Sequence, residues 1–161
     1  MNSYYENKKI LITGAASGIG RLFASKVTEA GNVTLILWDQ NSDALHAFKK
    51  ELSRSEKAGV DVHVSALDIS DPDRILMESE HLKKEGLLPD IIINCAAIVK
   101  GSYFHEHTIE EIEKSIRINT LGSMWVVQTF LSDMIERGSG RVVNMGSASG
   151  YIGNPRMSVY A

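Results

Sequence analysis

Cysteine is scarce in this 161-residue sequence, since Cys95 is the one cysteine that it contains. A single cysteine excludes an internal disulfide framework and fits a reducing compartment. Long hydrophobic runs are lacking too, and runs such as TLILW at 34–38 are far too short to cross a bilayer. The first ten residues hold no apolar segment that could serve as a signal peptide. We therefore expect a soluble, cytoplasmic protein.

Blocks of like charge are also absent from the sequence. The 17 lysines and arginines stand against 20 acidic residues, which gives a formal net charge of −3. Binding to nucleic acid or to an anionic membrane needs clustered cations, so we expect neither partner. With 43% apolar residues the chain can bury one substantial core, and its length suggests a single domain over 1–161.

Short apolar runs alternate with amphipathic segments along the whole chain. The expected strands cover 8–13, 33–38, 60–66, 90–94 and 140–147. The expected helices cover 18–30, 41–58, 72–86 and 108–137, with Asp71 and Thr108 as N-caps of the last two. Strands joined by helices pair in parallel through right-handed crossovers. The predicted fold class is α/β, a Rossmann-type doubly wound parallel sheet that ends after strand five.

A glycine-rich turn, ITGAASGIGR, follows the first expected strand and opens the first helix. Gly14, Gly18 and Gly20 permit a tight turn and let a pyrophosphate approach the backbone closely. The free N–H groups at the start of the helix then favour the anion. Without a ligand, the same pattern would be an ordinary tight turn between a strand and a helix.

An acidic residue, Asp39, ends the second expected strand nineteen residues after Gly20. A carboxylate there can accept hydrogen bonds from both ribose hydroxyls of an adenosine, and it would repel a 2′-phosphate. Ser17, inside the turn, brings no positive charge that could bind such a phosphate. We therefore favour NAD over NADP, the alternative for Asp39 being an ordinary helix-capping acid.

The fourth expected strand ends in Asn94-Cys95-Ala96-Ala97, where the winding of the sheet reverses and ligands bind. No flanking charge in sequence would activate Cys95, so we interpret it as a small buried residue and not as a nucleophile. His105 and His107 have no third ligand at a sensible spacing, so we expect a solvated loop there and no metal.

Taken together, these motifs and four others resemble the short-chain dehydrogenase/reductase family, from about Lys8 to the last residue. The additional motifs are LDI at 67–69, RINTLG around Asn119, GRVVNMGSASG with Ser147, and SVY with Tyr160. The thirteen-residue gap between Ser147 and Tyr160 is the family's usual spacing. The stretch from GIGRLFA to LILWDQN looks most like the members that act on retinoids and steroids.

The resemblance implies a set of site residues. Asp68 would hydrogen-bond the adenine ring, and Asn94 would lie by the ribose and the strand backbone. Asn119 would hold a water in a proton relay, Ser147 would bind the substrate oxygen, and Tyr160 would be the acid/base. The implied cofactor-binding residues are Gly14, Ser17, Gly18, Ile19, Gly20, Asp39, Asp68, Ile69, Asn94, Ala96 and Tyr160. Two departures from the family pattern are Ala97, where glycine is usual, and MGS in place of a pair of serines.

The function implied is that of an NAD(H)-dependent alcohol dehydrogenase or carbonyl reductase that acts on a small, hydrophobic molecule, in a homo-oligomer. In the family, a lysine four residues after the tyrosine lowers its pKa, and here the sequence ends at Ala161. We therefore expect the 161-residue chain alone to be inactive and marginally stable. Strand five would be an exposed edge, and the apolar face around Met124, Val127 and Leu131 would lack cover.

Two other functions compete with the enzyme. A non-catalytic dinucleotide-binding module that works with a partner would explain the missing lysine, although Asn119, Ser147 and Tyr160 argue against it. A methyltransferase could hold S-adenosylmethionine in the glycine-rich turn, but the pairing of Ser147 with Tyr160 would have no purpose in it.

Overall fold

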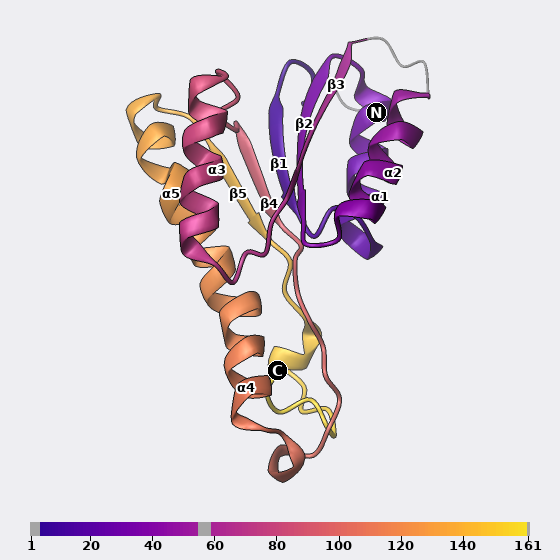
Figure 1. Ribbon diagram of the computed structural model, residues 1–161, viewed down its shortest axis with the longest axis vertical. Coiled ribbons are helices and arrows are strands. Elements are labelled where there is room, and N and C mark those ends of the chain that lie inside the picture. Colours follow the sequence, from indigo (N-terminus) through magenta and orange to yellow (C-terminus); the bar gives the residue numbers. More distant parts are fainter. Residues whose placement is uncertain (1–3, 55–58, 161) are drawn as a thin grey trace.

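The computed structural model describes residues 4–54 and 59–160, which form one parallel sheet, two layers of helices and a narrow arm below them (Figure 1). The strands are β1 (Lys9–Thr13), β2 (Val33–Asp39), β3 (Val60–Ala66), β4 (Ile91–Asn94) and β5 (Arg141–Asn144). Their order in the sheet is β3-β2-β1-β4-β5, and every pair is parallel. The chain therefore crosses from one side of β1 to the other between β3 and β4, which confirms the doubly wound fold predicted from the sequence.

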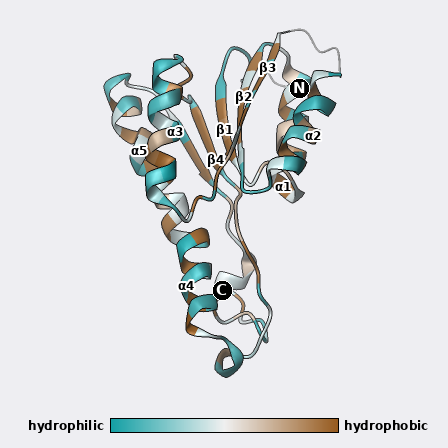
Figure 2. Cartoon of the chain, viewed as in Figure 1, coloured by the Kyte–Doolittle hydropathy of each residue, from teal (hydrophilic) through white to brown (hydrophobic). Residues whose placement is uncertain are grey.

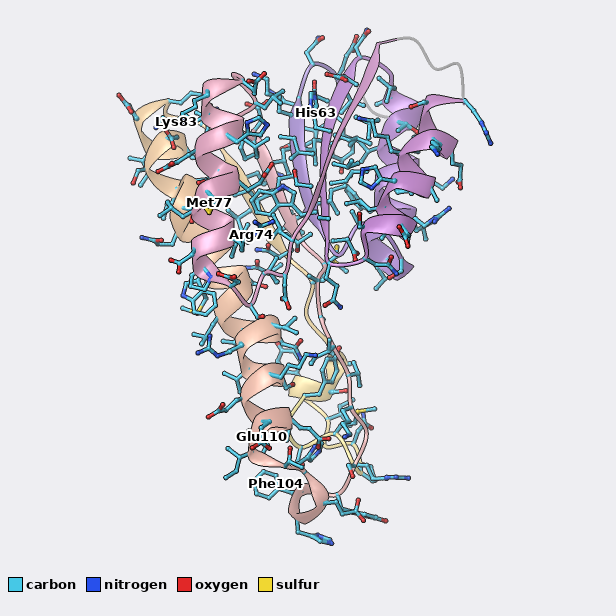
Figure 3. The ribbon with its side chains drawn as sticks, viewed as in Figure 1. His63, Arg74, Met77, Lys83, Phe104 and Glu110 are labelled. Atoms are coloured by element: carbon cyan, nitrogen blue, oxygen red, sulfur yellow. The ribbon has the colours of Figure 1, made fainter. Side chains whose placement is uncertain are left out.

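The helices cover both faces of this sheet. One face carries α1 (Gly18–Val27) and α2 (Ser42–Ser53), and the other carries α3 (Pro72–Lys84) and α5 (Ser123–Glu136) (Figure 1). The Lys83 ammonium of α3, labelled in Figure 3, lies 2.6 Å from the Asp133 carboxylate and ties α3 to α5. The arm is formed by α4 (Ile109–Ile116), the preceding connection and the segment after β5.

Successive side chains of the inner strands point into the hydrophobic cores on opposite faces of the sheet. This explains why the sequences of these strands are continuously apolar. Ile10 and Ile12 of β1 pack on the α1–α2 side, whereas Leu11 packs on the α3–α5 side, and all three are fully buried. The brown hydrophobic colour of these strands in Figure 2 lies between the two layers of helices.

Local sequence signals place most element boundaries where they were expected. The side chains of Asn41, Asp71 and Thr108 accept hydrogen bonds at the starts of α2, α3 and α4. Gly86 takes a positive φ of 68° just after α3, as the predicted stop requires. The first helix ends earlier than predicted, in a 3₁₀ turn over Thr28–Ala30, and the expected helix at 55–58 lies outside the described residues.

The long helix predicted over 108–137 is instead three pieces. A π turn (Arg117–Gly122) separates α4 from α5. Gly122, its last residue, packs so closely on the loop after β3 that a Cβ there would lie 2.8 Å from Ile69. A π turn inserts one extra residue into the helix, and such insertions gather at functional sites.

The sheet ends in an exposed edge at β5, as predicted, although this strand is shorter than the expected 140–147. The apolar face of α5 is likewise open, since Met124 is 61% and Leu131 42% exposed, while Val127 is half-buried. Within the described part of the chain, no helix is long and apolar enough to cross a membrane.

Candidate active site

A crevice of about 280 Å³ opens at the carboxyl ends of β1, β2 and β4, where the winding of the sheet reverses. Nine of the residues predicted to bind the cofactor line it, namely Gly14, Ser17, Gly18, Ile19, Gly20, Asp39, Asp68, Ile69 and Ala96. The structure adds Trp38, Gln40, Leu67, Cys95, Ala97, Ile98 and Ile118. Most of these are chain neighbours of predicted residues, but nothing in the sequence singled out Ile98.

The glycine-rich turn is as tight as the motif requires. Gly14 has a φ of 66°, and a Cβ at this position would lie 2.8 Å from the backbone of Ala96 at the tip of β4. A Cβ on Gly20 would lie 2.3 Å from the carbonyl oxygen of Gly14. The first N–H groups of α1 have no acceptor within the helix, so the turn presents donors and a positive dipole to an anion in the crevice.

The charges that line the crevice are two carboxylates, Asp39 and Asp68, and no lysine, arginine or histidine is among the described lining residues. The Asp39 carboxylate accepts hydrogen bonds from Ala16 N at 3.0 Å and Asn41 N at 2.9 Å. The Asp68 carboxylate accepts one from Ser70 N at 2.9 Å. Buried Leu67 and Ile69 flank Asp68 and supply an apolar wall.

Thr13, which sequence reasoning missed, fixes the far wall of the crevice. Its hydroxyl oxygen accepts hydrogen bonds from Cys95 N and Ala96 N, both at 3.2 Å, and so joins the tip of β1 to the chain leaving β4. The signal available in the sequence was a hydroxyl residue at the end of an otherwise apolar strand.

Asn94 differs from its expected place beside a ribose. It is 3% exposed and is not among the described residues that line the crevice. Its side-chain amide donates to Asn144 Oδ1 at 2.8 Å, since the two asparagines are direct partners in the parallel ladder of β4 and β5. Asn94 therefore joins two strands within the sheet, which accounts for its polar side chain in a buried strand.

Asn119 lies on the π turn, and its side chain makes two hydrogen bonds with the backbone of Ile98. Its Oδ1 accepts from Ile98 N at 2.8 Å and its Nδ2 donates to Ile98 O at 2.9 Å. Ile98 lines the crevice and also a second cavity, of about 270 Å³, whose lining includes Tyr160. The asparagine thus holds the partition between the two cavities.

Ser147 is not among the described residues that line the cavity of Tyr160. Ser147 is exposed, and its hydroxyl oxygen accepts a hydrogen bond from Ser149 N at 3.2 Å as the cap of a short 3₁₀ turn (Ala148–Gly150). Tyr160 is half-buried among Ile98, Lys100 and Val159, without Ser147 among the described residues of that lining.

The profile of the family described as short chain dehydrogenase matches residues 8–161 of this sequence. The chain belongs to this family. It is 36% identical to epidermal retinol dehydrogenase 2 of Mus musculus over 151 residues, which cover 94% of this chain and 48% of that protein. It is 32% identical to 17-beta-hydroxysteroid dehydrogenase 13 of Rattus norvegicus over 142 residues, which cover 88% of this chain and 46% of that protein. The chain thus spans about half the length of these curated relatives.

Solved structures agree on the fold of this short-chain dehydrogenase. NAD⁺-bound xylitol dehydrogenase superposes with a TM-score of 0.89 at 23% identity, over 98% of this chain and 60% of that one. A short-chain dehydrogenase from Streptomyces avermitilis superposes with a TM-score of 0.84 at 27% identity, over 95% and 54% of the two chains. The family and the fold together support a nicotinamide dinucleotide as cofactor.

The two histidines of the HEH stretch are not alike, so the predicted solvated loop is half wrong. His105 is exposed, but the His107 side chain is 2% exposed and lines the cavity of Tyr160. Its Nδ1 lies 3.5 Å from Glu111 Oε2. The hydrogen bond from Lys100 holds the pKa of the Glu111 carboxyl below its usual range, with a further contribution from His107. The three residues fasten the connection after β4 to α4.

Cys95 lines the crevice but is poorly suited to nucleophilic chemistry. It is half-buried, and this burial raises the pKa of its thiol. A raised pKa leaves less thiolate, which is the reactive form. The side chain acts as a small wall residue, in keeping with the prediction that it is no nucleophile.

Proposed function

We propose that this protein is an NAD(H)-dependent oxidoreductase that interconverts an alcohol and a ketone or aldehyde by hydride transfer. The observation that carries the proposal is the crevice, where a tight glycine turn and two carboxylates meet without a lining cation in the described chain. The names of the relatives, a retinol dehydrogenase and a hydroxysteroid dehydrogenase, favour a hydrophobic alcohol as substrate.

The residues of the crevice would hold the adenosine and pyrophosphate of the cofactor. The turn at Gly14–Gly20 offers backbone N–H groups to the pyrophosphate, and Asp39 offers lone pairs to the ribose hydroxyls. A 2′-phosphate would meet the Asp39 carboxylate with no nearby cation to neutralise it, which favours NAD over NADP. Asp68, between two apolar residues, would hydrogen-bond the adenine.

The bound nicotinamide supplies the hydride chemistry. Tyr160 would give a proton to the substrate oxygen in reduction and take it back in oxidation, while Ser147 orients that oxygen. A free tyrosine has a pKa of about 10, so a nearby cation is needed for it to act as a base at neutral pH. A polypeptide limited to these 161 residues has no lysine after Tyr160, so we expect it to bind NAD without turnover.

The first test is a tryptophan-fluorescence titration with NAD and NADP, because Trp38 lines the crevice. We expect NAD to bind at least tenfold more tightly. Turnover is then assayed with a retinoid and a steroid alcohol, both on the 161-residue polypeptide and on the longest natural chain that contains it. Equal affinity for the two cofactors would contradict the proposed preference for NAD. Failure to bind either cofactor would contradict the proposed oxidoreductase function.

A non-catalytic dinucleotide-binding module is the second candidate, since Ser147 is not among the described residues that line the cavity of Tyr160. Such a module would bind NAD and yet show no turnover in any length of chain. The same titration and assays therefore separate the two functions. The proposed cytoplasmic location and homo-oligomeric state are tested by imaging a tagged protein and by light scattering.

A further inference from the structure

Asp39 makes two backbone hydrogen bonds that recognition of a ribose does not require. Its Oδ1 accepts from Asn41 N at 2.9 Å, which is a local bond at the start of α2. Its Oδ2 accepts from Ala16 N at 3.0 Å, across 23 residues of sequence. Because Ala16 lies inside the glycine-rich turn, this second bond joins the tip of β2 to the turn that follows β1.

The surroundings of Ala16 make this bond costly to lose. Ala16 is 5% exposed and Ala15 is fully buried, so water has little access to their N–H groups. Ala15 N donates to the carbonyl oxygen of Trp38 at 3.2 Å, so two successive N–H groups of the turn end on β2. A buried N–H without an acceptor is strongly disfavoured, and a carboxylate is a stronger acceptor than a neutral group.

We propose that Asp39 is a positioning residue that sets the shape of the glycine-rich turn, in addition to reading the ribose. Recognition of the ribose by Asp39 rests on the proposed function, whereas the hydrogen bond from Ala16 N to Asp39 does not. A carboxylate has about four lone-pair sites, so Asp39 can brace the turn and accept ribose hydroxyls together.

The double role has a consequence for cofactor choice. Replacing Asp39 to admit a 2′-phosphate would loosen the turn that receives the pyrophosphate. Gln40, the next residue, also lines the crevice. Gln40→Arg is therefore the substitution expected to raise affinity for NADP while leaving the turn intact.

The direct test is amide hydrogen exchange at Ala16 in Asp39→Asn, measured by NMR without ligand. We expect exchange at this amide to be about tenfold faster than in the unsubstituted protein, after correction for global stability. The matched control is Asp43→Asn, which removes a charge from the first turn of α2, at an exposed residue. An unchanged Ala16 rate in Asp39→Asn would overturn the proposal.

A second test compares ADP with 2′,3′-dideoxyadenosine 5′-diphosphate, which has no ribose hydroxyls for Asp39 to read. If Asp39 positions the turn, Asp39→Asn should weaken binding of the dideoxy nucleotide by about fivefold. This loss should exceed any change in affinity that Asp43→Asn causes through charge alone. If Asp39→Asn weakens the binding of ADP but not of the dideoxy nucleotide, Asp39 recognises the ribose and does not position the turn. If neither nucleotide binds the unsubstituted protein, the proposed function fails, while the exchange rate still decides the brace.

The proposal stays testable if Asp39→Asn does not fold. In the unsubstituted protein, Ala16 should then be a protected amide although it lies outside every helix and strand. Exchange of Ala16 as fast as an exposed loop amide would overturn the proposal without any variant.

Discussion

The cofactor crevice and the arm that carries Tyr160 are built in different ways. The crevice sits on the tips of buried strands, and Ile10, Leu11 and Ile12 of β1 have no exposed surface. The arm hangs below the sheet (Figure 1), and its last segment is open, since Tyr151 is 95% exposed. Phe104 and Glu110, labelled at the end of the arm in Figure 3, lie far from the sheet.

The difference teaches that the proposed cofactor site and the proposed acid/base rest on separate supports. The crevice is fixed at the strand tips, where the side chains of Thr13 and Asp39 accept hydrogen bonds from backbone N–H groups of neighbouring segments. The cavity of Tyr160 depends on side-chain contacts of α4 and of the loop after β4. Substitutions should therefore affect one function without the other, in ways that the following experiments measure.

Tyr160→Phe should separate the two regions most sharply. Loss of the hydroxyl removes the proposed acid/base, and general acid–base groups contribute about 10²- to 10⁴-fold to rate. We expect kcat to fall by that factor in the longest natural chain, with a far smaller change in the Kd for NAD, since the removed hydroxyl is the proposed proton-transfer group. A similar loss of NAD affinity would show that the arm and the crevice are one unit.

Phe130→Ala should destabilise the protein far more than Val143→Ala. Phe130 is 1% exposed and packs with its ring centroid 6.0 Å from that of Trp38, whereas Val143 lies on the open edge strand. Truncating a buried phenylalanine costs about 3–5 kcal/mol, and a surface change costs about 0.5 kcal/mol or less. Urea unfolding measures both, and comparable losses would mean that the edge of the sheet is covered in solution.

Gly14→Val should lower the affinity for NAD by about 100-fold or more. The new Cβ would lie 2.8 Å from Ala96, at a backbone φ of 66° that disfavours any side chain. Gly138→Ala is the control, because its φ is 67° but no atom lies within 4 Å of the added Cβ. The control should lose a little stability and keep its affinity in the fluorescence titration.

Glu111→Gln should lower the melting temperature at neutral pH by a small amount. Lys100 and the N–H of Thr108 hold the pKa of Glu111 below its ordinary value, so the ionised carboxylate stabilises the folded arm. This contribution is complete above the ordinary pKa of about 4.3 and disappears as pH falls through the lowered value. The difference between the two proteins should thus shrink below about pH 4, and a difference that grows in acid would contradict it.

Local sequence patterns predicted what local physics determines. The caps at Asp71 and Thr108 and the tight turn at Gly14 depend on residues a few positions apart, and the structure has them where expected. The apolar runs likewise predicted the buried strands. The crevice followed, because the ends of parallel strands must meet at one edge.

Long-range contacts explain what the sequence missed. Gly122, at the end of the π turn, packs against Ile69, and Asn94 lies opposite Asn144 in the ladder. The His107 side chain is buried, and it lines a cavity together with Val159 and Tyr160, which lie far along the sequence. No spacing in the sequence reports such partners, and the roles of Asn119, Ser147 and Tyr160 stay predictions.

The contact of Gly122 with Ile69 connects the crevice to the cavity of Tyr160. Ile69 lines the crevice, Gly122 ends the turn that holds Asn119, and Asn119 holds Ile98 at the wall of the cavity of Tyr160. Gly122 has no side chain whose rotation could change this spacing, so the contacts between these residues act as a rigid spacer. It sets how far Ile69, in the lining of the crevice, lies from the cavity of Tyr160.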